Sequence, residues 1–258
     1  MKYTNYRLKL SYDGTAFSGW QKQTGRETDT VQGRLEAVAS KLAGEQVSVN
    51  GAGRTDAGVS ALCQVANVRL PGAAEPEEVR AYFNKYLPET VSVDKAELCP
   101  DRFHARLWAV RKTYEYYVWK GEKPPVFARK YVYCESRPTD AGRMSREAAL
   151  LIGEHDMAGF SSLRHPSKST VRTVYAAEIA TRPAGGSGSI LVMRFTGDGF
   201  LYNQVRIMAG TLLDVAAGKL PEGTVTRVFE TGDRQLAGLT APPNALFLTD
   251  VDYGNRDR

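Results

Sequence analysis

The sequence predicts an α+β fold, with a largely antiparallel sheet that carries helices on one face. Segments that alternate apolar and polar residues, as half-buried strands do, recur along the chain. Between them lie segments whose apolar residues recur every three or four positions, as in amphipathic helices. Over the first hundred residues the order is β, α, β, β, α, β, which favours an antiparallel sheet over alternating βα units.

In the first half, a strand is predicted where Tyr6, Leu8, Leu10 and Tyr12 alternate with polar residues. A helix is predicted next, because its apolar residues are spaced by four, three and four positions; these residues are Val31, Leu35, Val38 and Leu42. Gly44 follows and marks the C-terminal end of this helix. The next elements are strands at 46–50 and 62–70 around a loop at 51–61, a helix at 75–87 that starts with Pro76, and a strand at 91–98.

The second half repeats this pattern loosely. We expect strands at 108–120 and 131–135, a helix at 140–152 capped by Asp140, a hairpin of 171–182 with 190–195, a long helix at 200–219 and a last strand at 246–253. No low-complexity linker separates the halves, so two lobes that share a sheet are predicted, an N-terminal lobe of residues 1–106 and a C-terminal lobe of residues 107–258.

Composition narrows the class of protein. With 42% hydrophobic and 24% charged residues, the 258-residue chain is neither disordered nor fibrous. Its 34 Lys and Arg against 29 Asp and Glu give a net charge of +5, which favours a polyanionic partner. The three cysteines form no CxxC pair, which favours a reducing compartment. The first residues, MKYTNYRLKL, carry charges throughout, so we do not expect them to be a signal peptide. The most apolar later stretch is interrupted by Asp214, so we expect a cytoplasmic protein without a membrane segment.

Several common sites are missing from the sequence. It contains no HExxH, GxxxxGK[ST] or GxSxG motif, and its three histidines lack the spacing of metal ligands. The glycines that begin at Gly51 resemble a dinucleotide loop, but Asp56 stands where the third glycine belongs. We therefore expect neither a bound metal nor a nucleotide cofactor.

The first candidate for chemistry is the glycine-rich loop that contains Arg54, Thr55 and Asp56. It has two interpretations. In one, it is a tight turn in which Asp56 binds backbone amides. In the other, the backbone presents the carboxylate closely to a substrate, where an ordinary aspartate with a pKa of about 3.9 is ionised and acts as nucleophile or base.

A second candidate is the segment 102–131, in which eight Lys or Arg alternate with eight aromatic residues. Such a mixture suits RNA, because basic side chains neutralise phosphates and aromatic faces stack on bases. A strand with an aromatic core face and a charged solvent face explains it equally well.

Two further basic features stand out. Arg206 falls within an apolar helical stretch, where a charge is costly unless it meets a carboxylate or phosphate, or unless the side chain extends to the surface. Arg164, His165, Lys168 and Arg172 form a basic loop that either contacts phosphates or is simply solvated.

Together these segments resemble the tRNA pseudouridine synthase A family. The resemblance covers essentially the whole chain and is carried by residues 12–23 (YDGTAFSGWQKQ), 51–59 (GAGRTDAGV) with 64–68, 102–106 with 111–118, 153–162, 197–219 and 241–253. The first two motifs are specific, and both occur in the family's order near the N-terminus.

The resemblance implies a function and a set of site residues. Asp56 would be the catalytic aspartate, Tyr114 the residue that stacks on the target uracil, Arg206 the partner of the aspartate, and Arg54 a residue that helps to hold the flipped nucleotide. The family isomerises uridine to pseudouridine in the anticodon stem-loop of tRNA, needs no cofactor, and acts as a homodimer in which one tRNA contacts both subunits. Its pseudouridine synthase fold has two similar α/β lobes around a continuous mixed sheet, with the active cleft between them.

Three positions depart from the family pattern. Ser60 stands where the family usually has His, and Asn203 and Gln204 stand where it often has His and Met. These changes leave the catalytic residues intact and bear on which uridines or RNAs are accepted. A synthase for another RNA and a non-catalytic RNA-binding protein both stay open. So does the first step of the reaction, in which Asp56 attacks C1′, adds to C6 or removes a sugar proton.

Overall fold

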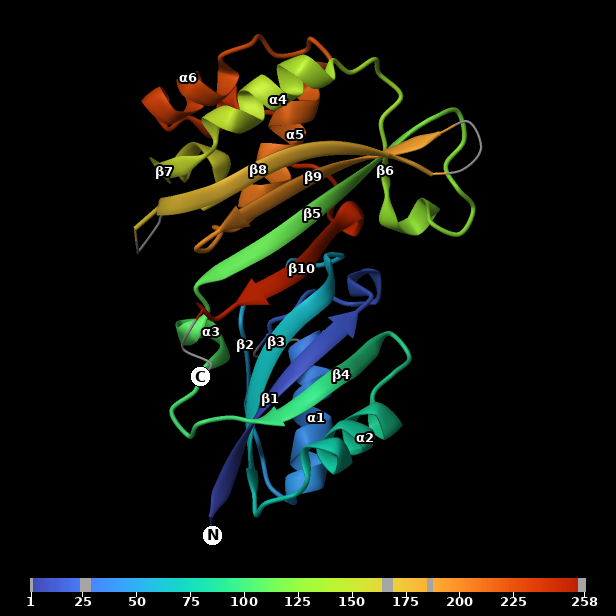
Figure 1. Cartoon of the computed structure of the whole chain (residues 1–258), viewed down its shortest axis with the longest axis vertical. Helices are drawn as coiled ribbons and strands as arrows, with labels where there is room; N and C mark the ends of the chain where they lie inside the picture. Colours follow the sequence, from blue (N-terminus) through green and yellow to red (C-terminus); the bar gives the residue numbers. More distant parts are fainter. Residues whose placement is uncertain (1, 24–28, 164–168, 185–187, 255–258) are drawn as a thin grey trace. The chain divides into compact units, whose positions relative to one another are not determined.

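The computed structural model describes residues 2–23, 29–163, 169–184 and 188–254. The chain forms two compact units (Figure 1): unit 1 contains residues 1–110 and 247–258, and unit 2 contains residues 111–246. The expected lobes of 1–106 and 107–258 differ from these units in the last strand. That strand lies in unit 1, because it pairs with a strand from the first half of the chain.

Unit 1 is built on a mixed sheet. Its strands are β1 (Tyr3–Tyr12), β2 (Val49–Gly51), β3 (Ser60–Pro71), β4 (Val91–Leu98) and β10 (Leu246–Asp252). Strand β1 lies between β3 and β4 and is antiparallel to both, while β2 pairs antiparallel with β3. Strand β10 runs parallel to β3, with Phe247 opposite Ser60.

Two helices cover one face of this sheet (Figure 1), α1 (Val31–Ala43) and α2 (Pro76–Tyr86). The predicted C-terminal end of α1 is confirmed, because Gly44 adopts φ 71° there. At the start of the helix, the Thr30 side chain accepts a hydrogen bond from Gly33 N. Leu8, Leu35 and Phe83 are fully buried in the core. The short helices α3 (Ala105–Trp108) and η1 (Gly14–Ala16) were not predicted, because a single turn has no periodicity to detect.

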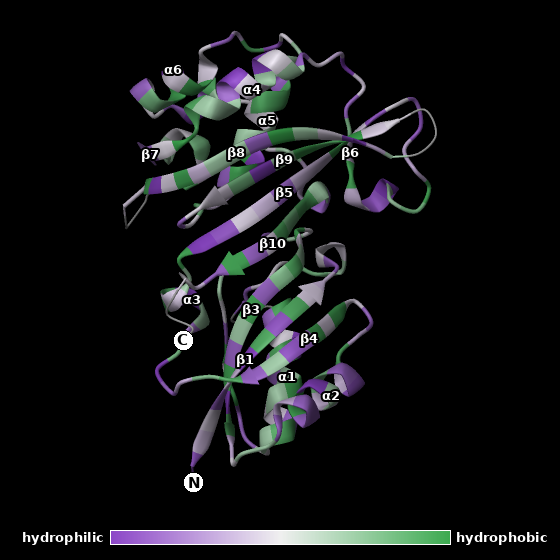
Figure 2. Ribbon diagram, in the orientation of Figure 1, coloured by the Kyte–Doolittle hydropathy of each residue, from purple (hydrophilic) through white to green (hydrophobic). Residues whose placement is uncertain are grey.

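Unit 2 contains an antiparallel sheet in the order β5, β9, β8, β7. The short strand β6 pairs in parallel with β5. Its strands are β5 (Arg111–Lys120), β6 (Tyr133–Cys134), β7 (Gly153–Asp156), β8 (Val171–Pro183) and β9 (Ser189–Gly197). The predicted hairpin is therefore confirmed as β8 and β9. The bands of hydropathy along β1 and β8 in Figure 2 show the alternation from which the strands were predicted.

The helices of unit 2 are α4 (Ala141–Leu150), α5 (Gln204–Ala216) and α6 (Thr224–Thr231), with single turns η2 (Arg129–Tyr131), η3 (Ala158–Phe160), η4 (Arg234–Leu236) and η5 (Pro243–Ala245). Asp140 caps α4 as predicted, with its side chain accepting from Arg143 N. Helix α5 begins at Gln204, four residues later than predicted, because Asn203 adopts a left-handed φ of 61°. Strand β7 and helix α6 were not predicted.

The described part of the chain contains no helix that is both long and apolar enough to cross a membrane. Helix α5 is the most buried of the described helices, since every one of its residues except Arg206 is buried. The fold of unit 2 therefore places Arg206 in the first turn of a buried helix.

Candidate active site

Asp56 lies in the loop between β2 and β3. Val59 N donates to Asp56 O at 3.1 Å, and Gly58 adopts φ 84°, so the chain turns sharply just after the aspartate. Asp56 is half-buried, Arg54 is exposed and Thr55 is buried. The tight turn expected from the glycines is therefore present in the backbone, and the loop is anchored through Thr55.

The first motif of the chain supports this loop. Trp20 N donates to Thr55 O at 3.0 Å, and the Tyr12 and Thr55 hydroxyls are 2.8 Å apart. From β3, Gln64 Nε2 donates to Gly53 O at 2.9 Å and to the Tyr12 hydroxyl at 3.4 Å. The two sequence motifs near the N-terminus thus form one local structure around Asp56.

Three glycines allow this close packing. A Cβ on Gly14 would lie 1.9 Å from Val59 O, and one on Gly51 would lie 2.3 Å from Cζ2 of Trp20. Gly19, at φ 99°, approaches Thr55 O so closely that a Cβ would be 2.9 Å away. A side chain at any of these three positions would clash with the loop or with Trp20, which explains why both motifs have glycine there.

Tyr12 and Ser60 were not selected as site residues from the sequence. Burial raises the pKa of Tyr12 to about 12, although the hydrogen bonds with Thr55 and Gln64 partly oppose the shift, so the phenol stays protonated at neutral pH. The buried Ser60 hydroxyl accepts from Gly14 N at 3.0 Å. Ser60, noted above as a departure from the family pattern, therefore ties the first motif to β3.

Tyr114 lies on β5 of unit 2, and 7% of its surface is exposed. Its ring packs edge-on against Phe200, with centroids 5.4 Å apart and planes at 90°. Phe200 comes from the segment that leads into α5. This edge-to-face contact restrains the plane of the Tyr114 ring.

Arg206 is held at the start of α5 by two acceptors of its own unit. Its Nε donates to Ala241 O at 2.8 Å and its Nη1 donates to Asn203 Oδ1 at 2.7 Å. Asn203 is itself fixed, because its Nδ2 donates to Ser162 Oγ at 3.0 Å. Ala241 O and Asn203 Oδ1 are neutral acceptors, so these two hydrogen bonds orient the guanidinium.

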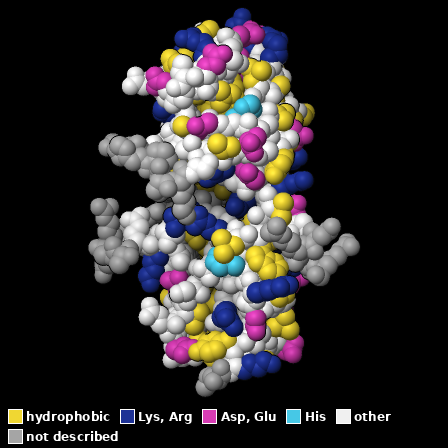
Figure 3. All heavy atoms as spheres, turned by 90° about the vertical axis from the view of Figure 1, so that its left-hand side faces the viewer, with side chains coloured by type: hydrophobic (Ala, Val, Ile, Leu, Met, Phe, Trp, Pro, Cys, Tyr) yellow, Lys and Arg dark blue, Asp and Glu magenta, His cyan; other side chains and the backbone are white. Residues whose placement is uncertain are grey.

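Of the eight aromatic residues of the segment 102–131, four are buried, three are half-buried and one is exposed. Phe103, Tyr116 and Trp119 are at most 4% exposed, which favours the interpretation of an aromatic core face. Trp108, Tyr117 and Tyr131 are half-buried, and Phe127 is 96% exposed. Figure 3 shows Lys and Arg side chains interspersed with acidic and hydrophobic ones on one face of the molecule, so basic residues are not confined to this segment.

The other basic and histidine positions are structural where they are described. Arg172 donates to the carbonyls of Ser169 and Val171, while Arg164, His165 and Lys168 lie outside the described residues. His155 stacks on Phe229 at 4.2 Å. Within the described ranges, no group of three or more His, Cys, Asp or Glu side chains could hold a metal ion.

Comparison with known proteins adds the family. Residues 10–107 and 148–254 match the family described as tRNA pseudouridine synthase. Proteins named tRNA pseudouridine synthase A are similar over nearly their full length: one from Bacillus sp. (strain KSM-64) is 39% identical over 96% of this chain and 99% of its own. Another, from Streptococcus equi subsp. equi, is 40% identical over 97% of this chain and 99% of its own. With its two N-terminal motifs joined around Asp56, this chain belongs to the tRNA pseudouridine synthase family.

Proposed function

We propose that this protein isomerises uridine to pseudouridine in tRNA, with the anticodon stem-loop as its target. Membership of the family supports the reaction and the class of RNA. The observation that carries the assignment is the Asp56 loop, which Tyr12, Trp20 and Gln64 hold in one arrangement. Such preorganisation is what a catalytic carboxylate needs.

The reaction needs no external reactant. The N-glycosidic bond between N1 and C1′ breaks, the uracil turns while still bound, and C5 joins C1′. C5 then loses its proton and N1 gains one, so substrate and product are isomers. A base inside a helix is out of reach of a carboxylate, so the target nucleotide must first leave the stack, at a cost of a few kcal/mol. Asp56 starts the reaction, and attack on C1′, addition to C6 and abstraction of a sugar proton all require its ionised form.

Three further residues have proposed roles. Tyr114 stacks on the displaced uracil, and its contact with Phe200 supports that role by restraining the ring plane. Arg206 supplies the positive charge that keeps Asp56 ionised; the two residues belong to different units, so their pairing stays a prediction from the resemblance. Arg54 is exposed within the loop and is assigned to the phosphates of the flipped nucleotide.

We also propose that the enzyme acts in the cytoplasm as a homodimer, without a metal or nucleotide cofactor. The resemblance supports the dimer, and the net charge of +5 suits a polyanionic substrate. The chemistry itself supports the absence of a cofactor, because nothing is oxidised or reduced.

The test is release of tritium from 5-tritiated uridine in unmodified tRNA. Asp56→Asn keeps the shape of the side chain and removes the charge, so turnover should fall by roughly a thousandfold or more while tRNA affinity changes little. Asp101→Asn, at an exposed aspartate of the same unit, is the control and should match the parent. A parent protein that binds tRNA but releases no tritium is a non-catalytic RNA-binding protein, and the proposal then fails.

A further inference from the structure

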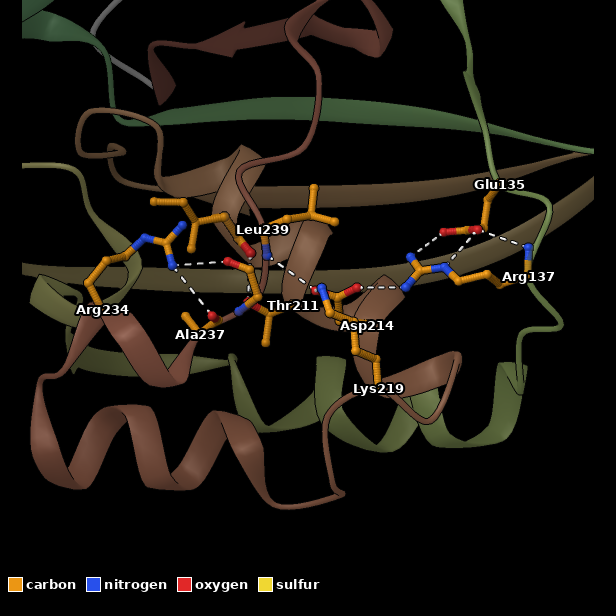
Figure 4. Close-up of polar contacts among 10 residues, drawn as sticks. Glu135, Arg137, Thr211, Asp214, Lys219, Arg234, Ala237 and Leu239 are labelled. Carbon is orange, nitrogen blue, oxygen red and sulfur yellow. Dashed lines mark hydrogen bonds and ion pairs between the residues drawn. The ribbon is translucent and has the colours of Figure 1, made fainter.

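The segment Ala237–Ala241, here called the support segment, is bound tightly to helix α5. Gly238 N donates to Thr211 Oγ1 at 2.9 Å, and Leu239 N donates to Asp214 Oδ2 at 3.3 Å. Figure 4 shows these contacts along one side of the helix. Side chains of α5 thus accept hydrogen bonds from consecutive backbone amides of the segment, which fixes its path along the helix.

Glycines bring the two backbones close together. A Cβ on Gly210 would lie 1.9 Å from Leu239 O, and a Cβ on Gly238 would lie 2.6 Å from Cα of Thr211. These approaches are backbone contacts, which cannot relax by a change of rotamer. The support segment therefore has one position on α5.

Arg234 also binds the support segment, and two cationic side chains hold Asp214 in place. Arg234 donates through Nη1 to Gly238 O at 2.9 Å and through Nη2 to Thr240 Oγ1 at 3.0 Å. Asp214, 1% exposed, pairs with Arg137 at 2.9 Å and with Lys219 at 3.2 Å (Figure 4). A buried carboxylate with two cationic partners is held in one orientation, because turning it would leave a buried charge unpaired.

The segment ends on Arg206. Ala241 N donates to Arg206 O at 3.1 Å, and Arg206 Nε donates back to Ala241 O at 2.8 Å. This reciprocal pair makes the direction of the Ala241 carbonyl, and with it the direction of the guanidinium, depend on where the segment lies. An arginine side chain has several rotatable bonds, so a fixed acceptor for Nε removes much of its freedom.

We propose that Thr211, Asp214 and Arg234 are positioning residues, which act through the support segment to set the guanidinium of Arg206. The inference rests on the proposed function, since it assigns Arg206 a role in the reaction. None of the three residues was identified from the sequence as part of the site. Their contribution is to the rate of the chemical step rather than to tRNA affinity.

Thr211→Val tests the proposal, because valine keeps the shape of threonine and removes the acceptor of Gly238 N. We expect single-turnover tritium release from tRNA to slow by roughly tenfold, with tRNA affinity within about twofold of the parent.

Thr231→Val is the matched control. Thr211 Oγ1 donates to Ile207 O, four residues earlier, and Thr231 Oγ1 likewise donates to Arg227 O. Thr231 also accepts a later amide, from Asp233, but neither of its bonds involves the support segment. The control variant should react like the parent.

A double-variant experiment separates positioning from general loss of structure. Arg206→Lys keeps the charge but has no Nε–H to donate to Ala241 O, so adding Thr211→Val to it should slow the reaction no further. Equal slowing by Thr211→Val in the parent and in Arg206→Lys overturns the inference. So does a folded Thr211→Val protein with the parent's rate.

Two other outcomes are covered. If Thr211→Val does not fold, Arg234→Gln makes the same comparison in both backgrounds, since it removes the bonds to Gly238 and Thr240. If the parent itself releases no tritium, the proposed function fails and this inference fails with it. The two failures are distinguishable. Failure of the proposed function is visible with the parent protein alone, whereas failure of this inference in an active parent is visible only in the variants.

Discussion

At the scale of single residues, Tyr12 connects parts of the chain that are far apart in sequence. Its hydroxyl lies 2.8 Å from Thr55 Oγ1 and accepts from Gln64 Nε2, so one buried phenol links β1, the Asp56 loop and β3. A buried hydroxyl that lost these partners would be left unsatisfied. The hydrogen bonds of Tyr12 thus couple the stability of unit 1 to the geometry of the loop.

The raised pKa of Tyr12 predicts a pH dependence of stability. Because its pKa is about 12 in the folded protein and 10.0 without the fold, its stabilising contribution is complete below pH 10 and is lost as the pH rises toward 12. Between pH 8 and pH 11 the parent should lose about 1.4 kcal/mol of unfolding free energy that Tyr12→Phe does not lose. Urea unfolding at both pH values measures this, and identical losses would contradict it.

Arg206 provides the second prediction at this scale. Arg206→Met keeps most of the bulk and removes the charge, so the pKa of Asp56 should rise and turnover should fall strongly. Arg206→Lys should retain part of the activity, because the point charge survives although the planar fork does not. The acidic limb of the single-turnover pH profile should move upward in the Met variant. A folded Met variant with the parent's rate and acidic limb would show that Arg206 is not the partner of Asp56.

At the scale of elements, helix α5 differs from an ordinary amphipathic helix. Its buried residues occupy every side, with sheet, helices and the support segment around it. The support segment packs directly against the helix at Gly210. The glycine is needed there because a Cβ would clash with Leu239 O, and not because the helix must be flexible. Helix α5 is thus packed on all sides within unit 2 and carries Arg206 in its first turn.

Substitution of two helical glycines distinguishes this packing from helix propensity. Gly to Ala within a helix ordinarily stabilises by up to about 1 kcal/mol. Gly210→Ala should instead destabilise by about 1–3 kcal/mol, because its Cβ would meet Leu239 O at 1.9 Å. Gly142→Ala in α4 is the control, since its Cβ would meet only the side-chain ends of Asp140 and Arg146 at 3.1 and 3.3 Å. Urea unfolding measures both, and equal effects would refute the packing argument.

At the scale of the whole molecule, the prediction concerns assembly. The resemblance implies that one tRNA contacts two subunits, so we expect a dimer of the 28.4 kDa chain at micromolar concentration without RNA. Sedimentation equilibrium at several protein concentrations measures the mass directly. A mass equal to that of the single chain throughout would refute the homodimer and leave the assignment of the reaction untouched.

The sequence by itself determined the elements whose cause is local. Alternation predicted β1, and Gly44, Pro76 and Asp140 marked helix ends, because capping and backbone preferences act between residues that are close in the chain. The motif around Asp56 and the apolar setting of Arg206 also drew attention to the two residues without any structure. Short elements such as α3 and β7 escaped, because they are shorter than the periods that reveal structure.

Only the tertiary structure decided how distant segments meet. The pairing of β10 with β3, the hydroxyl of Tyr12 beside Thr55, and the hold of Ala241 on Arg206 join residues separated by about 35 to 190 positions. It also gave Ser60 and Asn203, conspicuous in the sequence only as departures from a pattern, their roles as hydrogen-bond partners within the scaffold. The physical reason is that a hydrogen bond depends on where the folded backbone places its two partners, and no periodic pattern in the sequence records that placement.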